Sequence, residues 1–127
     1  ELLASQMRKH KANAWLINTG WSGGAYGVGA RMSLDYTRAI IHAIHDGSLA
    51  KAKTQTDSVF GLEVPLECAG VPAEILIPRQ TWNDKSAFDA TAHKLATLFA
   101  ENFKKYESDT SDAVKSAGPE LPASTVV

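Results

Sequence analysis

A glycine-rich stretch between an apolar run and a helix constrains this chain more than any other feature. Residues 15–38 read WLINTGWSGGAYGVGARMSLDYTR, in which the apolar run Trp15–Ile17 comes first, Arg31 follows the last glycine and a helix is expected from about Ser33. Glycines let a backbone approach a ligand closely, and a helix N-terminus offers free N–H groups and the positive end of a dipole. The order of these parts is typical of sites for phosphorylated ligands.

The two common phosphate-binding motifs are nevertheless missing from the sequence. The pattern GxxxxGK[ST] needs a Gly-Lys pair, which does not occur, and in GxGxxG the pair Gly27 and Gly29 would need glycine or alanine where Met32 stands. The residues alone therefore leave two interpretations open. The stretch is either a ligand-binding loop or a hairpin whose glycines have a purely structural use.

Composition and charge exclude several classes of protein. At 127 residues, with 44% hydrophobic and 21% charged residues, the chain has the length and composition of one globular domain. The formal net charge is −1 without a basic block, which argues against nucleic-acid binding. The apolar runs are too short for a membrane span, and a single cysteine, Cys68, fits a reducing compartment. We therefore expect a cytoplasmic location, with no membrane and no nucleic acid among the partners.

Three helices are expected from apolar spacing and capping residues. The first covers about residues 1–11, and the second covers residues 34–46, capped by Ser33 and ended by Gly47. The third begins near Asn83 or Asp84 and presents an apolar face that includes Phe88, Ala92, Leu95, Phe99 and Phe103.

Two short strands are expected between these helices. Residues 14–18 form the first, whose apolar side chains are consecutive rather than alternating, which suits a strand covered on both faces, and residues 59–64 form the second. The fold class predicted is α/β, a partial mixed sheet with flanking helices, and two strands are too few for a complete sheet. Because the chain also opens ELLASQMRKH, within an expected helix and without an initiator methionine, we expect it to be a piece of a longer protein.

Few side chains suggest chemistry by their spacing alone. His42 and His45 are three residues apart on the second helix, but a third metal ligand is missing, and surface histidines are the simpler interpretation. Arg31 is the only cation between Lys11 and Arg38, and its guanidinium can stack on a nucleotide or form forked hydrogen bonds. Thr37 sits one turn into the second helix, where its hydroxyl could reach the same ligand. The alternative interpretations are that Arg31 pairs with a surface carboxylate and that the Thr37 hydroxyl bonds to its own helix backbone.

Several longer segments resemble one family closely. They read WLINTGWSGGAYGVGARMSLDYTRAIIHAIHDGSL and VFGLEVPLECAGVPAEILIPRQTWNDKSAFDATAHKLATLFAENFKKYE. Both resemble the C-terminal region of ATP-dependent phosphoenolpyruvate carboxykinases. The specific parts are NTGW, the run Arg-x-Ser-x-x-x-Thr-Arg at residues 31–38, and LATLFAENFKKY. The resemblance covers about residues 2–118.

The resemblance implies a lyase that also transfers a phosphoryl group. Such enzymes are gluconeogenic and convert oxaloacetate and ATP into phosphoenolpyruvate, ADP and CO₂, with Mg²⁺ on the nucleotide and Mn²⁺ or Mg²⁺ at a second site. Carried over by position, Arg31, Met32 and Thr37 would bind the adenine and ribose end of ATP. The family's phosphate loop, metal ligands and catalytic residues would lie upstream of Glu1, so this chain is expected to hold no catalytic or metal-binding residue.

The resemblance also divides the chain and defines a rival. Residues 1–106 would be the C-terminal part of the ATP-binding, mononucleotide-binding domain, and residues 107–127 a polar tail. The remainder of the enzyme would be the partner, and the isolated piece is expected to be inactive. Ala30 departs from the charged residue common in relatives, which bears on the charge of the loop.

The rival hypothesis is a non-catalytic nucleotide-binding or partner-docking module derived from the same fold.

Overall fold

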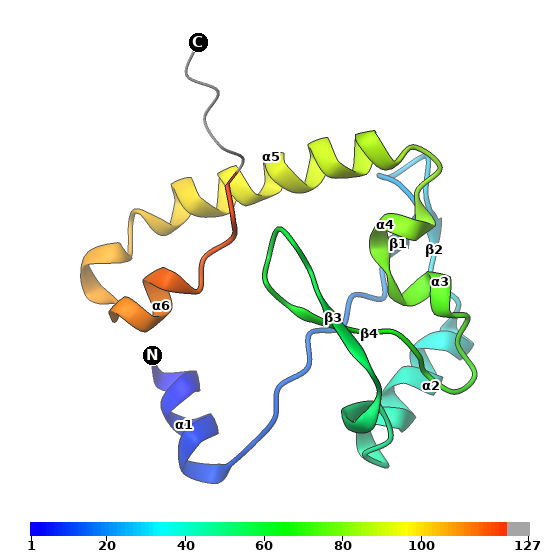
Figure 1. Ribbon diagram of the computed structural model, residues 1–127, viewed down its shortest axis with the longest axis horizontal. Coiled ribbons are helices and arrows are strands. Elements are labelled where there is room, and N and C mark those ends of the chain that lie inside the picture. Colours follow the sequence, from blue (N-terminus) through cyan, green and yellow to red (C-terminus); the bar gives the residue numbers. More distant parts are fainter. Residues whose placement is uncertain (122–127) are drawn as a thin grey trace.

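The computed structural model describes residues 1–121 and contains helices joined by short antiparallel strand pairs (Figure 1). In chain order the elements are α1 (Leu2–His10), β1 (Trp21–Ser22), β2 (Ala30–Arg31), α2 (Leu34–His45), the 3-10 turn η1 (Leu49–Lys51), β3 (Thr54–Thr56), β4 (Glu63–Pro65), α3 (Ala73–Leu76), α4 (Pro78–Thr81), α5 (Lys85–Phe103), η2 (Glu107–Asp109) and α6 (Asp112–Ser116). The hairpin β1–β2 gathers with α2, α3 and α4 at one end of α5, and α1 lies with α6 toward the other (Figure 1).

The three expected helices are confirmed, with their predicted caps on the second and third. Ser33 Oγ accepts a hydrogen bond from the Asp35 amide at 3.3 Å and begins α2, and Asp84 Oδ1 accepts one from the Ala87 amide at 3.0 Å and begins α5. Gly47 follows α2 with a φ of +77°, a left-handed conformation that favours glycine. Local residue chemistry therefore fixes where these helices begin and where α2 ends.

The expected sheet differs from the sheets that form. Residues 1–121 contain two separate two-stranded antiparallel sheets, β1–β2 and β3–β4, and no mixed sheet. The mixture of helices and strands remains compatible with the α/β class, but each sheet is a local hairpin. Sequence patterns give the apolar character of a strand without giving its neighbours, so the expectation of one mixed sheet was wrong for this part of the chain.

Residues 14–18 form no strand, contrary to the prediction. Their backbone has no hydrogen-bonded neighbour within the described part of the chain, and a strand needs one. Leu16, in the middle of this segment, is 92% exposed, so its side chain is not buried against the described part of the chain.

The second expected strand is shifted toward the C-terminus. Val59 and Phe60 lie in a turn, because the Asp57 carboxylate accepts hydrogen bonds from both of their amides, at 3.1 and 2.6 Å. Only Glu63–Pro65 pairs with β3. The Glu63 carboxylate accepts hydrogen bonds from the hydroxyls of Thr54 and Thr56 at 2.5 and 2.6 Å, and these bonds hold the pKa of Glu63 below its ordinary value.

Few apolar residues are buried: Ala43, Leu49 and Val71 near α2, and a cluster under α5. Val59, Ala92 and Ala96 are buried, and Phe60 and Phe88 pack against them. Many larger apolar side chains are exposed, among them Leu2, Leu16, Leu98 and Phe99. Within residues 1–121, no helix combines the length and apolarity needed to cross a membrane.

The segment after α5 is more ordered than a polar tail suggests. Residues 107–121 contain η2 and α6, and the Glu120 amide donates to the Val59 carbonyl at 2.7 Å. The Ser111 amide donates to Glu1 Oε1 at 2.8 Å, which brings the start of α1 to α6. The last part of the predicted tail, residues 122–127, lies outside the described residues.

Candidate functional site

The glycine-rich stretch folds as a hairpin. Trp21 on β1 pairs with Arg31 on β2, and the loop between the strands closes on itself. A Cβ on Gly29 would lie 2.5 Å from the Gly24 carbonyl oxygen, closer than real Cβ atoms approach. A side chain at Gly29 would therefore push the strands apart. Of the two interpretations left open by the sequence, the structure shows the hairpin in which the glycine is needed for structural reasons.

The hairpin also lies directly against α4. Gly23 has a φ of +82°, and a Cβ at this position would lie 2.9 Å from the Thr81 carbonyl oxygen. Thr81 is the last residue of α4. The absence of a side chain at Gly23 is what lets the two backbones meet.

Arg31 and Met32 occupy the junction between the hairpin and α2. Arg31 ends β2, the Met32 amide donates to the Gly20 carbonyl at 2.9 Å, and Ser33 begins α2. Both residues line one surface depression of about 400 Å³. The full lining is Ser22, Gly23, Ala30, Arg31, Met32, Ser33, Tyr36, Glu74, Ile75 and Thr81.

The Arg31 side chain is exposed at the edge of this depression. Within residues 1–121, no carboxylate forms an ion pair with its guanidinium, and no hydrogen bond from it is found. The surface carboxylate partner considered from the sequence is therefore not seen in the described part of the chain. The N–H donors of the guanidinium are therefore accessible to solvent or to a ligand.

Thr37 lies one turn into α2, and it does not line the depression. Its hydroxyl donates to the Ser33 carbonyl at 3.3 Å, which is the intrahelical bond that the sequence allowed. The hydroxyl oxygen can still accept a hydrogen bond while it donates this one. The structure thus brings Arg31 and Met32 together, with Thr37 nearby on α2, and the predicted role of Thr37 stays a prediction.

Charges of both signs lie at or near the depression, because the Arg31 guanidinium and an acidic residue both line it. Asp35 stands in the first turn of α2, where its carboxylate already interacts with the positive end of the helix dipole, and Glu74 lines the depression. Met32, Tyr36 and Ile75 supply apolar surface in the same place.

Some residues of the depression were missed from the sequence. Tyr36 lies in α2, but Met32 precedes that helix, so helical spacing in the sequence does not connect the two residues. Ile75 and Thr81 belong to α3 and α4, two short helices that were not predicted from the sequence. No local pattern joins them to Arg31, because their contact with the hairpin is tertiary.

A larger depression, about 800 Å³, lies beside the C-terminal end of α2 and includes Cys68, Asp46 and Glu67. Burial and the nearby Asp46 raise the pKa of the Cys68 thiol, so the thiol stays protonated at neutral pH and is a poor nucleophile. None of the three predicted ATP-binding residues lines this depression. Its size alone therefore assigns it no function.

The histidines of α2 remain on the surface. His42 Nε2 lies 3.9 Å from Asp46 Oδ2, and the His42 side chain is 81% exposed. In residues 1–121, no three His, Cys, Asp or Glu side chains are grouped so that they could hold a metal ion.

Comparison with known proteins gives a consistent result. A family model described as phosphoenolpyruvate carboxykinase matches residues 1–74. The chain is 57% identical over 122 residues to phosphoenolpyruvate carboxykinase (ATP) of Dictyostelium discoideum, an alignment covering 96% of this chain and 22% of that protein. It is 54% identical over 123 residues to phosphoenolpyruvate carboxykinase (ATP) 2 of Salinibacter ruber, covering 97% of this chain and 23% of that protein. The chain thus spans 22–23% of the length of these curated relatives.

Proposed function

This chain belongs to the ATP-dependent phosphoenolpyruvate carboxykinase family, and we propose that it works as part of a longer enzyme that makes phosphoenolpyruvate in gluconeogenesis. The substrates of that enzyme are oxaloacetate and ATP, and the products are phosphoenolpyruvate, ADP and CO₂. Identity above half over nearly the whole chain supports the assignment.

Within that enzyme, the chain supplies the adenine and ribose side of the ATP site. The observation that carries this role is the depression at the hairpin–α2 junction, where Arg31 and Met32 meet without a carboxylate paired to Arg31 in the described residues. The Arg31 guanidinium stacks on the base or donates forked hydrogen bonds, and Met32 contacts the ring through its side chain. The Thr37 hydroxyl accepts a hydrogen bond from the ribose end.

The chain takes no direct part in decarboxylation or phosphoryl transfer. In this proposal the metal ions and the phosphates bind to residues of the longer enzyme that lie outside this chain. When bound, divalent cations stabilise the negative charge that develops on the enolate and on the transferred phosphoryl group. The contribution of Arg31, Met32 and Thr37 is to hold and orient the nucleotide.

The partner of this chain is the rest of the same enzyme. The extended segment at residues 14–18 has an unpaired backbone within the described part, and Trp15, Leu16 and Ile17 are all exposed there. Exposed apolar side chains on a segment whose backbone is unpaired are unfavourable in water. Such a segment can instead pair with a strand from another part of the protein. This segment is where we expect the longer enzyme to cover the chain.

Substitution of Arg31 in the longer enzyme tests the proposed site. Arg31→Ala should raise the KM for ATP roughly tenfold or more, since a hydrogen bond to a charged group contributes about 1.5–3 kcal/mol. The KM for oxaloacetate should stay unchanged, because that substrate does not contact Arg31. Arg8→Ala, which removes an exposed arginine on α1, is the matched control and should leave both values unchanged. An unaltered KM for ATP in Arg31→Ala would contradict the role of Arg31.

A further inference from the structure

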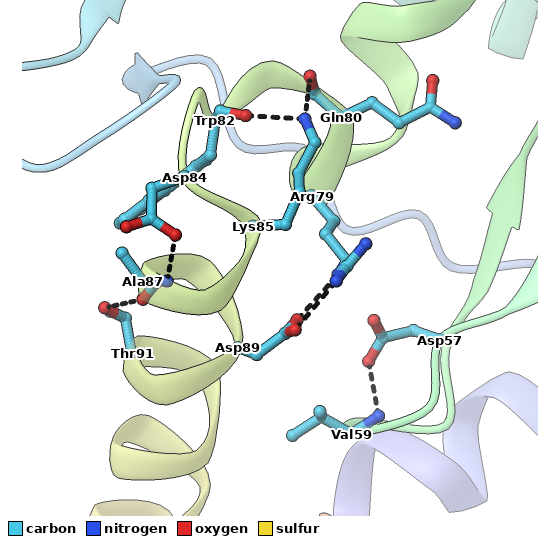
Figure 2. A network of polar contacts seen from close by, with 10 residues as sticks. All are labelled: Asp57, Val59, Arg79, Gln80, Trp82, Asp84, Lys85, Ala87, Asp89 and Thr91. Atoms are coloured by element: carbon cyan, nitrogen blue, oxygen red, sulfur yellow. Dashed lines mark hydrogen bonds and ion pairs between the residues drawn. The ribbon is translucent and has the colours of Figure 1, made fainter.

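A forked ion pair fastens the short helix α4 to the long helix α5. Arg79 Nε donates to Asp89 Oδ1 at 2.7 Å, and Arg79 Nη2 donates to Asp89 Oδ2 at 2.9 Å (Figure 2). The Arg79 guanidinium holds the pKa of Asp89 below its ordinary value, so the pair is fully charged near neutral pH. Two parallel bonds fix orientation as well as distance.

Lys85 makes a second connection at the end of α4. Its ammonium donates to the Gln80 carbonyl at 2.9 Å and to the Trp82 carbonyl at 2.6 Å (Figure 2). These two carbonyls flank Thr81, the last residue of α4, and Lys85 is the first residue of α5. The Thr81 peptide is therefore held between two fixed neighbours.

Helix α4 also contacts α3, and Trp82, directly after α4, packs edge-on against Phe88 of α5 with ring centroids 5.6 Å apart. Helix α4 contains four residues, and so short a helix is not stable by its own hydrogen bonds. The C-terminal end of α4 contacts the candidate site. The Thr81 carbonyl oxygen lies against Gly23, and Thr81 lines the same depression as Arg31. A shift of α4 relative to α5 would therefore move one wall of the depression.

We propose that Arg79, Asp89 and Lys85 are positioning residues for the nucleotide, which hold Thr81 against the hairpin and so keep the Arg31 depression in its binding shape. This inference rests on the proposed function, since it assumes that ATP occupies that depression. None of the three side chains lines the depression, so they act through α4. The chemical step is untouched by a change in this wall, and the affinity for ATP is the quantity that changes.

The exposure of the pair makes this role separable from stability. The Arg79 and Asp89 side chains are 51% and 44% exposed, and exposed pairs contribute little to the free energy of unfolding. Lys104 and Glu101, at the other end of α5, form a pair of 2.7 Å with 64% and 61% exposure. That pair matches the first in length and in exposure, but it is a single Lys–Glu bond between residues three apart and lies away from α4.

The test compares Asp89→Asn with Glu101→Gln in the longer enzyme. Asp89→Asn should raise the KM for ATP roughly threefold to tenfold, a size usual for residues that act on a site without touching its ligand. The kcat, the KM for oxaloacetate and the melting temperature should stay close to those of the unchanged enzyme. Glu101→Gln should change none of these values, and Asp89→Glu, which keeps the carboxylate, should restore much of the affinity for ATP.

The outcomes separate this inference from the proposed function. If Arg31→Ala raises the KM for ATP and Asp89→Asn does not, the site stands and the positioning role is overturned. If Asp89→Asn and Glu101→Gln raise it equally, the effect is a general one of charge or stability, and the inference is also overturned. If Arg31→Ala has no effect, the proposed site fails, and the inference fails with it whatever Asp89→Asn does.

Discussion

Gly23 and Thr81 meet so closely that a methyl group on Gly23 would lie 2.9 Å from the Thr81 carbonyl oxygen. This contact joins the hairpin that carries Arg31 to the helix that forms the opposite wall of the depression. The shape of the candidate site therefore depends on a position with no side chain.

Gly23→Ala should weaken both folding and ATP binding. The new methyl group adds a clash of about 1–3 kcal/mol to the strain of about 1–2 kcal/mol that a left-handed φ imposes on a residue with a Cβ. Gly27→Ala is the control, since Gly27 has a φ of +90° but no atom within 4 Å of the added Cβ. Thermal unfolding and the KM for ATP should both change more in Gly23→Ala. Equal changes in the two variants would show that the contact with Thr81 is unimportant.

Thr37→Val should raise the KM for ATP roughly twofold to tenfold, because a neutral hydrogen bond contributes about 0.5–1.5 kcal/mol. Thr37→Ser, which keeps the hydroxyl, should bind ATP nearly as well as the unchanged enzyme. Thr91→Val is the matched control, since the Thr91 hydroxyl makes the same intrahelical bond on α5, to the Ala87 carbonyl at 2.8 Å. If Thr37→Val and Thr91→Val behave alike in ATP titrations, the Thr37 hydroxyl serves only its own helix.

Glu63 should contribute to stability in a way that acid removes. Its pKa is lowered in the folded chain by the hydroxyls of Thr54 and Thr56, so the folded state binds this proton less readily than the unfolded state. The stabilisation is therefore complete above the unfolded value of about 4.3 and is lost as the pH falls through the lower folded pKa. The difference in melting temperature between the unchanged enzyme and Glu63→Gln should be constant from pH 6 to 5 and shrink below pH 4.3. A difference that grows in acid would contradict the assignment.

The sequence predicted what depends on local chemistry. Helices α2 and α5 begin where Ser33 and Asp84 cap them, and the hairpin glycines occupy positions that a side chain would disrupt. The junction residues Arg31 and Met32 could be placed together because they are adjacent in the chain. These features need only interactions within a few residues, which a single sequence displays.

What depends on distant residues could not be predicted. The wall formed by Ile75 and Thr81 comes from the short helices α3 and α4, which were not predicted from the sequence. The turn at Val59 is set by the Asp57 carboxylate, which outweighed the apolar strand pattern that follows it. The apolar run at residues 14–18 has the composition of a strand, yet a strand forms only where another backbone lies beside it.

The run at residues 14–18 gives the sharpest test of the longer enzyme. Leu16 is 92% exposed in this chain, and a substitution at so exposed a position ordinarily changes the free energy of unfolding by no more than about 0.5 kcal/mol. If a strand of the remaining enzyme covers this segment, Leu16→Asp buries a charge and should cost several kcal/mol instead. Soluble yield and melting temperature of the longer enzyme should therefore fall sharply in Leu16→Asp.

Ala12→Asp supplies the comparison, because Ala12 is also exposed and lies just after α1, outside the apolar run. It should leave yield and melting temperature nearly unchanged. Equal tolerance of aspartate at the two positions would mean that Leu16 stays in water in the whole protein and that residues 14–18 do not join a sheet. A loss of yield and melting temperature confined to Leu16→Asp would show that the rest of the enzyme covers residues 14–18. Because this segment leads into the hairpin that carries Arg31, its pairing in the sheet would also position the nucleotide site.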